Sequence, residues 1–95
     1  MKESQIEKFL VRKIKEGGGL CFKFISPGNP GVPDRIVITP TGKTIYVELK
    51  TETGRLTKIQ KLQIEQIREN GADVRVLYGI DGVKAFLGEV FQNAV

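Results

Sequence analysis

Apolar side chains recur at helical spacing in two segments of the chain, residues 4–16 and 57–70. Because residues three and four apart share one face of a helix, both segments are predicted to be helices that turn an apolar face toward a core. Each opens on a capping-box pattern, a Ser or Thr followed three residues later by Glu or Gln. The capping pairs are Ser4 with Glu7 and Thr57 with Gln60, and the apolar stripes are Ile6, Phe9, Leu10 and Ile14 in the first helix and Ile59, Leu62 and Ile67 in the second, with Ile64 on the margin.

Four shorter apolar runs are predicted to be strands, because they are rich in Val, Ile, Phe and Tyr and are bounded by Gly, Pro and Asn. The segment 26–33 is rich in proline and glycine, so it is a loop, and a turn at 40–42 joins the second strand to the third. The last strand follows a helix, which favours a parallel arrangement with the strand before that helix. The predicted strands cover residues 20–25, 34–39, 43–50 and 74–78.

This order of elements, αβββαβ, predicts an α/β fold in which a mixed four-stranded sheet is flanked by helices. The 95 residues are enough for one such domain, so residues 1–95 are expected to form a single unit. Beyond the last strand, a short helix at 82–86 and then a ragged apolar tail are expected. The apolar residues of this tail are Leu87, Val90, Phe91 and Val95.

Three charged side chains interrupt the apolar strands at positions that are expected to lie close together. Asp34 follows a proline at the entrance of one strand, while Glu48 and Lys50 share a face of the next, since side chains alternate along a strand. If the two strands pair as a hairpin, Asp34 lies on the same side, near Glu48. A Glu-x-Lys pattern occurs by chance on many ordinary edge strands. The apolar neighbours of these residues, however, embed them in a core sheet rather than a solvated face, which favours a functional site.

Two carboxylates and an ammonium group in this arrangement are typical of a divalent-metal site for phosphodiester hydrolysis. Mg²⁺ prefers hard oxygen ligands and binds through one or two carboxylates together with a substrate phosphate. Asp34 and Glu48 suit that role, and the backbone carbonyl of Leu49 would add a third oxygen. The cation, Mg²⁺ or Mn²⁺, would stabilise charge on the phosphate and acidify a water. Lys50 would orient that water or offset the developing charge.

The composition narrows the chemistry further. The chain contains no histidine, which excludes His-ligated zinc, Ser-His-Asp and Cys-His catalysis, and nucleases with a His general base. Its single cysteine, Cys21, cannot form an internal disulfide, which fits the reducing cytoplasm of a bacterial or virus-infected host cell. No apolar run approaches the roughly 20 residues of a membrane span. The net charge of +4 points to a polyanionic partner.

Four segments of the chain, in this order, resemble the VRR-NUC domain of the PD-(D/E)xK nuclease superfamily. They are Gly31–Asp34, Val47–Lys50, Arg55–Gln60 and Asn70–Val74. The similarity runs from about Glu7 to Tyr78. The four segments in order are more specific than the PD-(D/E)xK signature alone.

The resemblance implies a restriction-endonuclease-like fold and metal-dependent cleavage of DNA. It implies Asp34 and Glu48 as metal ligands, Lys50 as the catalytic lysine, and Gln60 and Glu7 as further active-site residues. Helix capping alone would also account for Gln60 and Glu7, since each occupies the last position of a capping-box pattern. The chain is similar to stand-alone, virus-type members of the family. That likeness implies a homodimer that cuts branched DNA such as four-way (Holliday) junctions.

Basic residues near these positions are candidates for contacts to the DNA backbone. A helix N-terminus with flanking cations is a suitable phosphate contact, although a solvated charged face explains each residue equally well. Aromatic and basic residues are not interleaved in the way that stacks single-stranded bases, which favours duplex or branched DNA. The candidates are Lys23, Arg35, Arg55, Lys58 and Lys61.

The sequence therefore predicts a Mg²⁺- or Mn²⁺-dependent DNA endonuclease that acts on branched DNA as a homodimer, with the apolar tail at or near the dimer interface. Two alternatives remain open at this point. One is a non-catalytic DNA-binding module with a decayed site, against which the intact Asp34, Glu48 and Lys50 argue. The other is an accessory nuclease that is active only with a helicase or replication partner.

Overall fold

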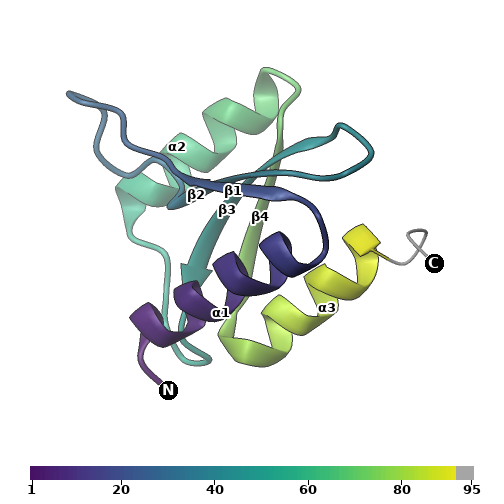
Figure 1. Ribbon diagram of the computed structural model, residues 1–95. Helices are drawn as coiled ribbons and strands as arrows, with labels where there is room; N and C mark the ends of the chain where they lie inside the picture. The colour runs from purple at the N-terminus through teal and green to yellow at the C-terminus, as the bar shows by residue number, and fades with distance from the viewer. Residues whose placement is uncertain (92–95) are drawn as a thin grey trace.

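The computed structural model describes residues 1–91, which form one four-stranded sheet and three helices (Figure 1). The predicted αβββαβ order is confirmed, and a third helix follows it. Most boundaries agree with the expected ones to within two residues. The elements are α1 (Glu3–Glu16), β1 (Leu20–Lys23), β2 (Arg35–Ile38), β3 (Thr44–Lys50), α2 (Lys58–Glu69), β4 (Asp73–Tyr78) and α3 (Gly79–Phe91).

The sheet is mixed, and its strand order is β1-β2-β3-β4. The pairs β1/β2 and β2/β3 are antiparallel, whereas β4 lies parallel to β3 after the crossover through α2, as expected. The ladder between β2 and β3 ends at the pair Arg35 and Val47. Residues 48–50 of β3 therefore continue past the start of β2, and this is the end of the sheet where the charged residues gather.

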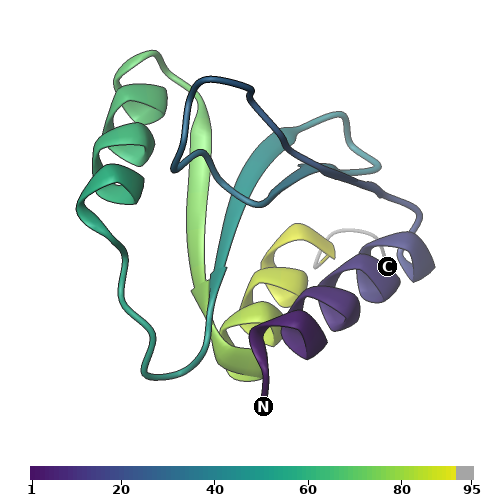
Figure 2. The same cartoon turned by 90° about the vertical axis from the view of Figure 1, so that its left-hand side faces the viewer.

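Helices cover both faces of the sheet. Helices α1 and α3 lie side by side on one face, and α2 lies on the other, as Figures 1 and 2 show. The main core fills the space between the sheet and the α1/α3 pair, because the side chains of β3 at Ile45, Val47 and Leu49 alternate toward that face. Glu48 and Lys50 consequently point toward the α2 side. No helix in residues 1–91 is long and apolar enough to cross a membrane.

The buried row of α2 differs from the predicted stripe. Ile64 is the buried residue, while Ile59 and Leu62 are 43% and 52% exposed. Because α2 packs against β4, the row at i, i+4 and i+7 that faces the sheet consists of Gln60, Ile64 and Ile67. The face of α2 that meets the sheet is thus a different one from the predicted face, and it includes Gln60.

The predicted capping box at Ser4 and Glu7 is wrong. Helix α1 begins at Glu3, so Ser4 lies inside its first turn and Gln5 occupies the third helical position. The Gln5 side chain accepts a hydrogen bond from the backbone N–H of Lys2 at 2.8 Å. Glu7 is therefore not a capping residue.

The C-terminal segment is one continuous helix rather than a short helix with a ragged tail. Val83, Phe86, Leu87 and Val90 recur at helical spacing along the whole segment and face the core. Leu87, Val90 and Phe91 are partly buried against the chain's own core, and the Phe91 ring covers the backbone of α1 where that helix ends. Val95, the last residue of the expected tail, lies outside the described residues.

The exposed apolar surface lies elsewhere. On β1, Leu20 and Phe22 are 50% and 52% exposed, and Ile25 just beyond the strand is 69% exposed. The side chains of Leu20 and Phe22 point away from α1, whereas Cys21 packs against the core on the α1 side. The edge strand β1 thus carries an uncovered apolar face.

Candidate active site

Asp34 is positioned by the loop between β1 and β2, which is fastened to the start of α2. Gly31 has φ of +88°, and a Cβ at this position would lie 3.0 Å from the backbone carbonyl of Ile59, so glycine allows the close approach. The side chain of Gln63 donates a hydrogen bond to the carbonyl of Pro30 at 3.2 Å. Pro33 is fully buried and directs the chain into β2. The loop therefore holds Asp34 at the entrance of the strand.

The structure brings Asp34, Glu48 and Lys50 together, as the hairpin arrangement predicts. Asp34 Oδ2 accepts a hydrogen bond from the backbone N–H of Leu49 at 2.9 Å, beyond the end of the β2/β3 ladder. Glu48 is only 1% exposed, and the Nζ of Lys50 lies 3.6 Å from its Oε2. Two carboxylates and one ammonium group thus meet at the end of the sheet where β3 extends past the first residue of β2.

Gln60 has two partners at the same time. Its Oε1 accepts a hydrogen bond from the backbone N–H of Thr57 at 2.9 Å, which completes the predicted capping box of α2. Its Nε2 donates a hydrogen bond to Glu48 Oε2 at 3.2 Å. The two explanations for this residue are therefore compatible, because one amide caps the helix and contacts the carboxylate.

The two carboxylates are held in an environment that disfavours their charged forms. Burial, followed by the negative charge of Asp34, raises the pKa of Glu48 to about 7, and Lys50 opposes this rise. Burial also raises the pKa of Asp34, against the hydrogen bond from Leu49. Glu48 Oε1 is buried and has no hydrogen-bond partner in the described residues. A buried carboxylate with an unpaired oxygen costs free energy unless a cation or proton compensates it.

These residues fit a hard divalent cation. Within residues 1–91 no three His, Cys, Asp or Glu side chains converge on one point, so the side-chain donors of such a site are a carboxylate pair. That is the number with which Mg²⁺ is commonly bound when waters and a substrate phosphate supply the rest. The unpartnered Oε1 of Glu48 provides an oxygen that no protein group occupies.

Glu7 and Arg35 lie beside this group but on the other face of the sheet. Arg35 Nε donates a hydrogen bond to Glu7 Oε2 at 2.8 Å, between β2 and α1. The structure therefore does not bring Glu7 into contact with Glu48. Glu3, one turn earlier on α1, was not predicted as a site residue, yet its charge contributes to the raised pKa of Glu48. The feature of the sequence that links Glu3 to these residues is its spacing of four from Glu7, because residues four apart lie on the same face of a helix.

The remaining basic candidates are on the surface. Arg55 lies in the connection before α2, and Lys58 and Lys61 lie in the first turns of that helix, close in sequence to Gln60. Lys23 ends β1 and is also exposed. Arg35 differs from these four residues because its guanidinium is already paired with Glu7.

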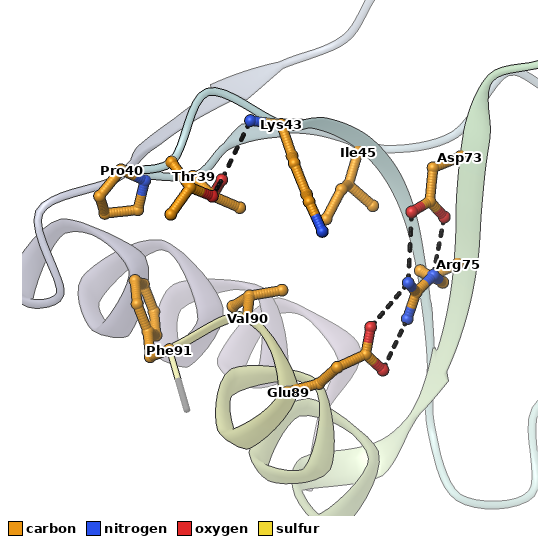
Figure 3. Close-up of a pocket in the computed structure, with 10 residues that line it drawn as sticks. Thr39, Pro40, Lys43, Ile45, Asp73, Arg75, Glu89, Val90 and Phe91 are labelled. Atoms are coloured by element: carbon orange, nitrogen blue, oxygen red, sulfur yellow. Dashed lines mark hydrogen bonds and ion pairs between the residues drawn. The ribbon is translucent and has the colours of Figure 1, made fainter. Parts of the chain in front are cut away.

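A cavity of about 300 Å³ at the opposite end of the sheet is a poorer candidate (Figure 3). Arg75 lines this cavity, and its guanidinium group lies between the carboxylates of Asp73 and Glu89, with N–O distances of 2.7 Å to each. The hydroxyls of Thr39 and Thr41 are 2.9 Å apart and form a hydrogen bond with each other. These five side chains thus pair with one another, in contrast to Glu48, and only the Lys43 side chain extends into the cavity without a pairing drawn to it in Figure 3.

Gln60→Glu and Thr57→Ala are expected to separate the two roles of the Gln60 amide. Glutamate keeps an oxygen for the Thr57 N–H but loses the donor to Glu48, so the DNA cleavage predicted from the sequence should fall by about tenfold or more. Thr57→Ala removes the hydroxyl that caps α2, which should cost about 0.5–2 kcal/mol of stability and leave cleavage intact. Urea unfolding and cleavage rates of both variants provide the measurement. Equal loss of cleavage in the two variants would mean that capping alone explains Gln60.

Comparisons with known proteins identify the family of the chain. The VRR-NUC domain family matches residues 1–81 of the chain. The protein called "Putative nuclease p44", from Acyrthosiphon pisum secondary endosymbiont phage 1, is 42% identical over 77 residues, which cover 81% of this chain and 83% of that protein. A solved structure described as "VRR_NUC domain" has a TM-score of 0.83 and 30% identity, covering 90% of this chain and 92% of its own. Another, described as "VRR_NUC domain protein", shares the fold with a TM-score of 0.76 at 17% identity, covering 97% of this chain and 89% of its own. The chain therefore belongs to the VRR-NUC domain family.

Proposed function

We propose that this protein is a Mg²⁺- or Mn²⁺-dependent DNA endonuclease. Its family and its relationship to a phage protein named as a nuclease support a nuclease. The observation that carries the metal dependence is the pair formed by the half-buried carboxylate of Asp34 and the buried carboxylate of Glu48, in which Glu48 Oε1 has no partner in the described residues. A cation at this position would relieve the cost of burying the two charges.

Asp34 and Glu48 would hold the cation, together with the backbone carbonyl of Leu49. In an antiparallel ladder the N–H and C=O of one residue face the same neighbouring strand, so the Leu49 carbonyl is expected on the side where its N–H meets Asp34. When bound, a divalent cation supplies positive charge for the scissile phosphate and acidifies a water.

Lys50 and Gln60 would complete the site. Lys50 has its ammonium group beside Glu48, at the open end of β3, where it would hold the attacking water or stabilise negative charge on the phosphate. Gln60 would keep the Glu48 carboxylate in one orientation through its Nε2–H. Both roles follow from groups that already contact Glu48.

DNA would be bound through its backbone. Lys58 and Lys61 are exposed at the N-terminal end of α2, the helix that also directs Gln60 toward Glu48, and Arg55 lies just before it. A helix N-terminus flanked by cations binds phosphate, and such contacts read backbone and shape rather than base sequence. We therefore propose duplex or branched DNA, including four-way junctions, as the substrate.

Cleavage should require Mg²⁺ or Mn²⁺ and should stop when EDTA is in excess. Ca²⁺ is expected to permit DNA binding without turnover, because its larger and more flexible coordination shell places the water poorly. The measurement is cleavage of labelled duplex, flap and four-way DNA by the purified protein with each cation. Full activity in excess chelator would contradict the metal-dependent mechanism. Binding without cleavage under every condition would indicate a DNA-binding module or a nuclease that needs a partner.

A four-way junction requires two symmetric cuts, and one chain carries one site, so we propose a two-fold homodimer. The apolar residues of α3 pack on their own core, which makes the exposed face of β1 the better candidate for the interface. Light scattering should give twice the 10.6 kDa of one chain, and Phe22→Asp should shift the protein to the monomer mass. A wild-type mass of one chain would contradict the dimer.

A further inference from the structure

A second cavity, the α2 cavity, lies between α2 and the face of the sheet that carries Glu48. Its volume is about 290 Å³, close to the lower limit of about 300 Å³ for small-molecule sites, and it is open to solvent. None of the described residues that line it is charged, whereas Asp73, Arg75 and Glu89 line the cavity of Figure 3. Its polar and aromatic lining consists of Phe24, Tyr46, Gln63, Gln66 and Asn70.

The α2 cavity adjoins the proposed metal site on the same face of the sheet. The backbone N–H of Phe24 donates a hydrogen bond to the carbonyl of Asp34 at 2.9 Å. Tyr46 precedes Glu48 by two residues, so both side chains share a face of β3 and their Cα atoms lie about 7 Å apart. A phosphate at the cation and a base in the cavity would therefore belong to one nucleotide or to two neighbouring ones.

Phe24 and Tyr46 form an aromatic surface in this cavity. Their ring centroids are 5.4 Å apart, and the ring planes are inclined by 51°. Both side chains are partly exposed rather than buried in the core. Nucleobases stack on accessible aromatic rings of this kind, and one such contact raises affinity by about tenfold or more.

Helix α2 supplies amide side chains to the same cavity. Gln63 donates a hydrogen bond to the carbonyl of Pro30 at 3.2 Å, and Asn70 donates one to the backbone carbonyl of Gln66 at 2.9 Å, so both amides are held in place. The Gln66 amide and the Tyr46 hydroxyl carry further donors and acceptors. Amides of this type pair with the donors and acceptors on the edges of bases. The lining thus suits a flat, uncharged group with both kinds of atom at its edge.

We propose that the α2 cavity binds one unpaired nucleobase of the DNA, beside the scissile phosphate. The inference rests on the proposed function and names the feature of branched DNA that the site recognises. A base in a continuous duplex must leave its stack to reach the cavity, which costs free energy, whereas a base at a branch point is already free to do so. The lysines of α2 contact any DNA backbone, and the cavity adds the preference for branched DNA.

Two DNAs that differ by one base test the inference without using activity. Both are fluorescently labelled flap duplexes, one with an unpaired adenine at the branch point and the other with an abasic residue there. Their dissociation constants are measured by fluorescence anisotropy with Ca²⁺ in place of Mg²⁺, so that the strands stay intact. Wild type should bind the adenine DNA about tenfold more tightly than the abasic DNA. Tyr46→Leu should bind the two DNAs alike.

Further variants keep the outcomes distinct. Gln66→Ala changes an exposed amide and should reduce the preference by about threefold, which provides a second test if Tyr46→Leu does not fold. Tyr46→Phe keeps the ring and should retain most of the preference. Glu65→Ala changes the neighbouring exposed residue, which does not line the cavity, and should retain all of it. Melting temperatures and light scattering of each variant separate a loss of stability or of a dimer from a change in binding.

Equal affinity of wild type for the adenine and abasic DNAs would overturn the inference. Mn²⁺-dependent cleavage of the same DNAs would then leave the proposed function standing. An unchanged preference in Tyr46→Leu and Gln66→Ala would also overturn it, because the base would then be bound elsewhere. The same holds if Tyr46→Leu turned a dimer into a monomer with its preference intact, since the cavity would then belong to a subunit interface. Wild type that neither binds nor cleaves DNA would overturn the proposed function and this inference together.

Discussion

Lys50→Ala and Glu48→Gln are each expected to reduce DNA cleavage by about 10² or more, because both residues would act on charge that develops in the transition state. Glu48 would lose its negative charge and with it a ligand of the cation. Lys50→Ala would remove the ammonium group that lies 3.6 Å from Glu48 Oε2. The measurement is the single-turnover rate on duplex and four-way DNA with saturating Mn²⁺.

The matched control is Lys43→Ala, which removes an exposed lysine just before the first residue of β3, Thr44. It should cleave at the wild-type rate. Circular dichroism of all three variants would show whether the fold is retained. Wild-type turnover by Glu48→Gln or Lys50→Ala would exclude the proposed site and leave the fold and family unaffected.

The second large effect is expected on the stability of the metal-free protein. Burial and the neighbouring Asp34 raise the pKa of Glu48 from 4.5 to about 7, so the folded state binds this proton more tightly than the unfolded state. Protonation of Glu48 therefore stabilises the folded state. This contribution is fully present below pH 4.5 and is lost as the pH rises through about 7. A shift of this size corresponds to about 3 kcal/mol. Asp34, whose pKa is also raised, acts in the same direction.

Urea unfolding in EDTA between pH 5 and pH 8 would measure this effect. Wild type should lose stability over that range, and Glu48→Gln should lose much less and exceed wild type at pH 8 by up to about 3 kcal/mol. Mn²⁺ should restore much of the wild-type stability at pH 8, because a cation compensates the buried charges. Glu65→Gln, which removes an exposed carboxylate of α2, is the control. An identical pH dependence in wild type and Glu48→Gln would contradict the assignment.

The sheet shows how far local pattern determines the structure. Apolar runs bounded by proline and glycine located all four strands, and the helix between the last two predicted their parallel pairing. Asp34, Glu48 and Lys50 were also predicted to lie together, because a hairpin register and a period of two place them on one side. Each of these properties depends on neighbours that are close in sequence.

The helices show where local pattern is insufficient. Ser4 and Glu7 satisfy a capping-box spacing, yet the cap forms two residues earlier, between Lys2 and Gln5, and Glu7 pairs with Arg35, 28 residues away. In α3, a helix was expected only at 82–86, but packing against α1 and the sheet maintains one helix through Phe91. Helix propensity is a small contribution that tertiary burial readily exceeds.

The sequence by itself determined the αβββαβ order, the place of the three central charged residues and the resemblance to a nuclease family. The tertiary structure decided which oxygen of Glu48 is unpaired and that Gln60 both caps α2 and contacts Glu48. It also decided that Glu7 forms an ion pair with Arg35. The physical reason is that periodicity selects a face of an element, whereas a partner across the sheet depends on how far each helix is rotated when it packs. That rotation is set by the whole core, and no short segment of the sequence contains it.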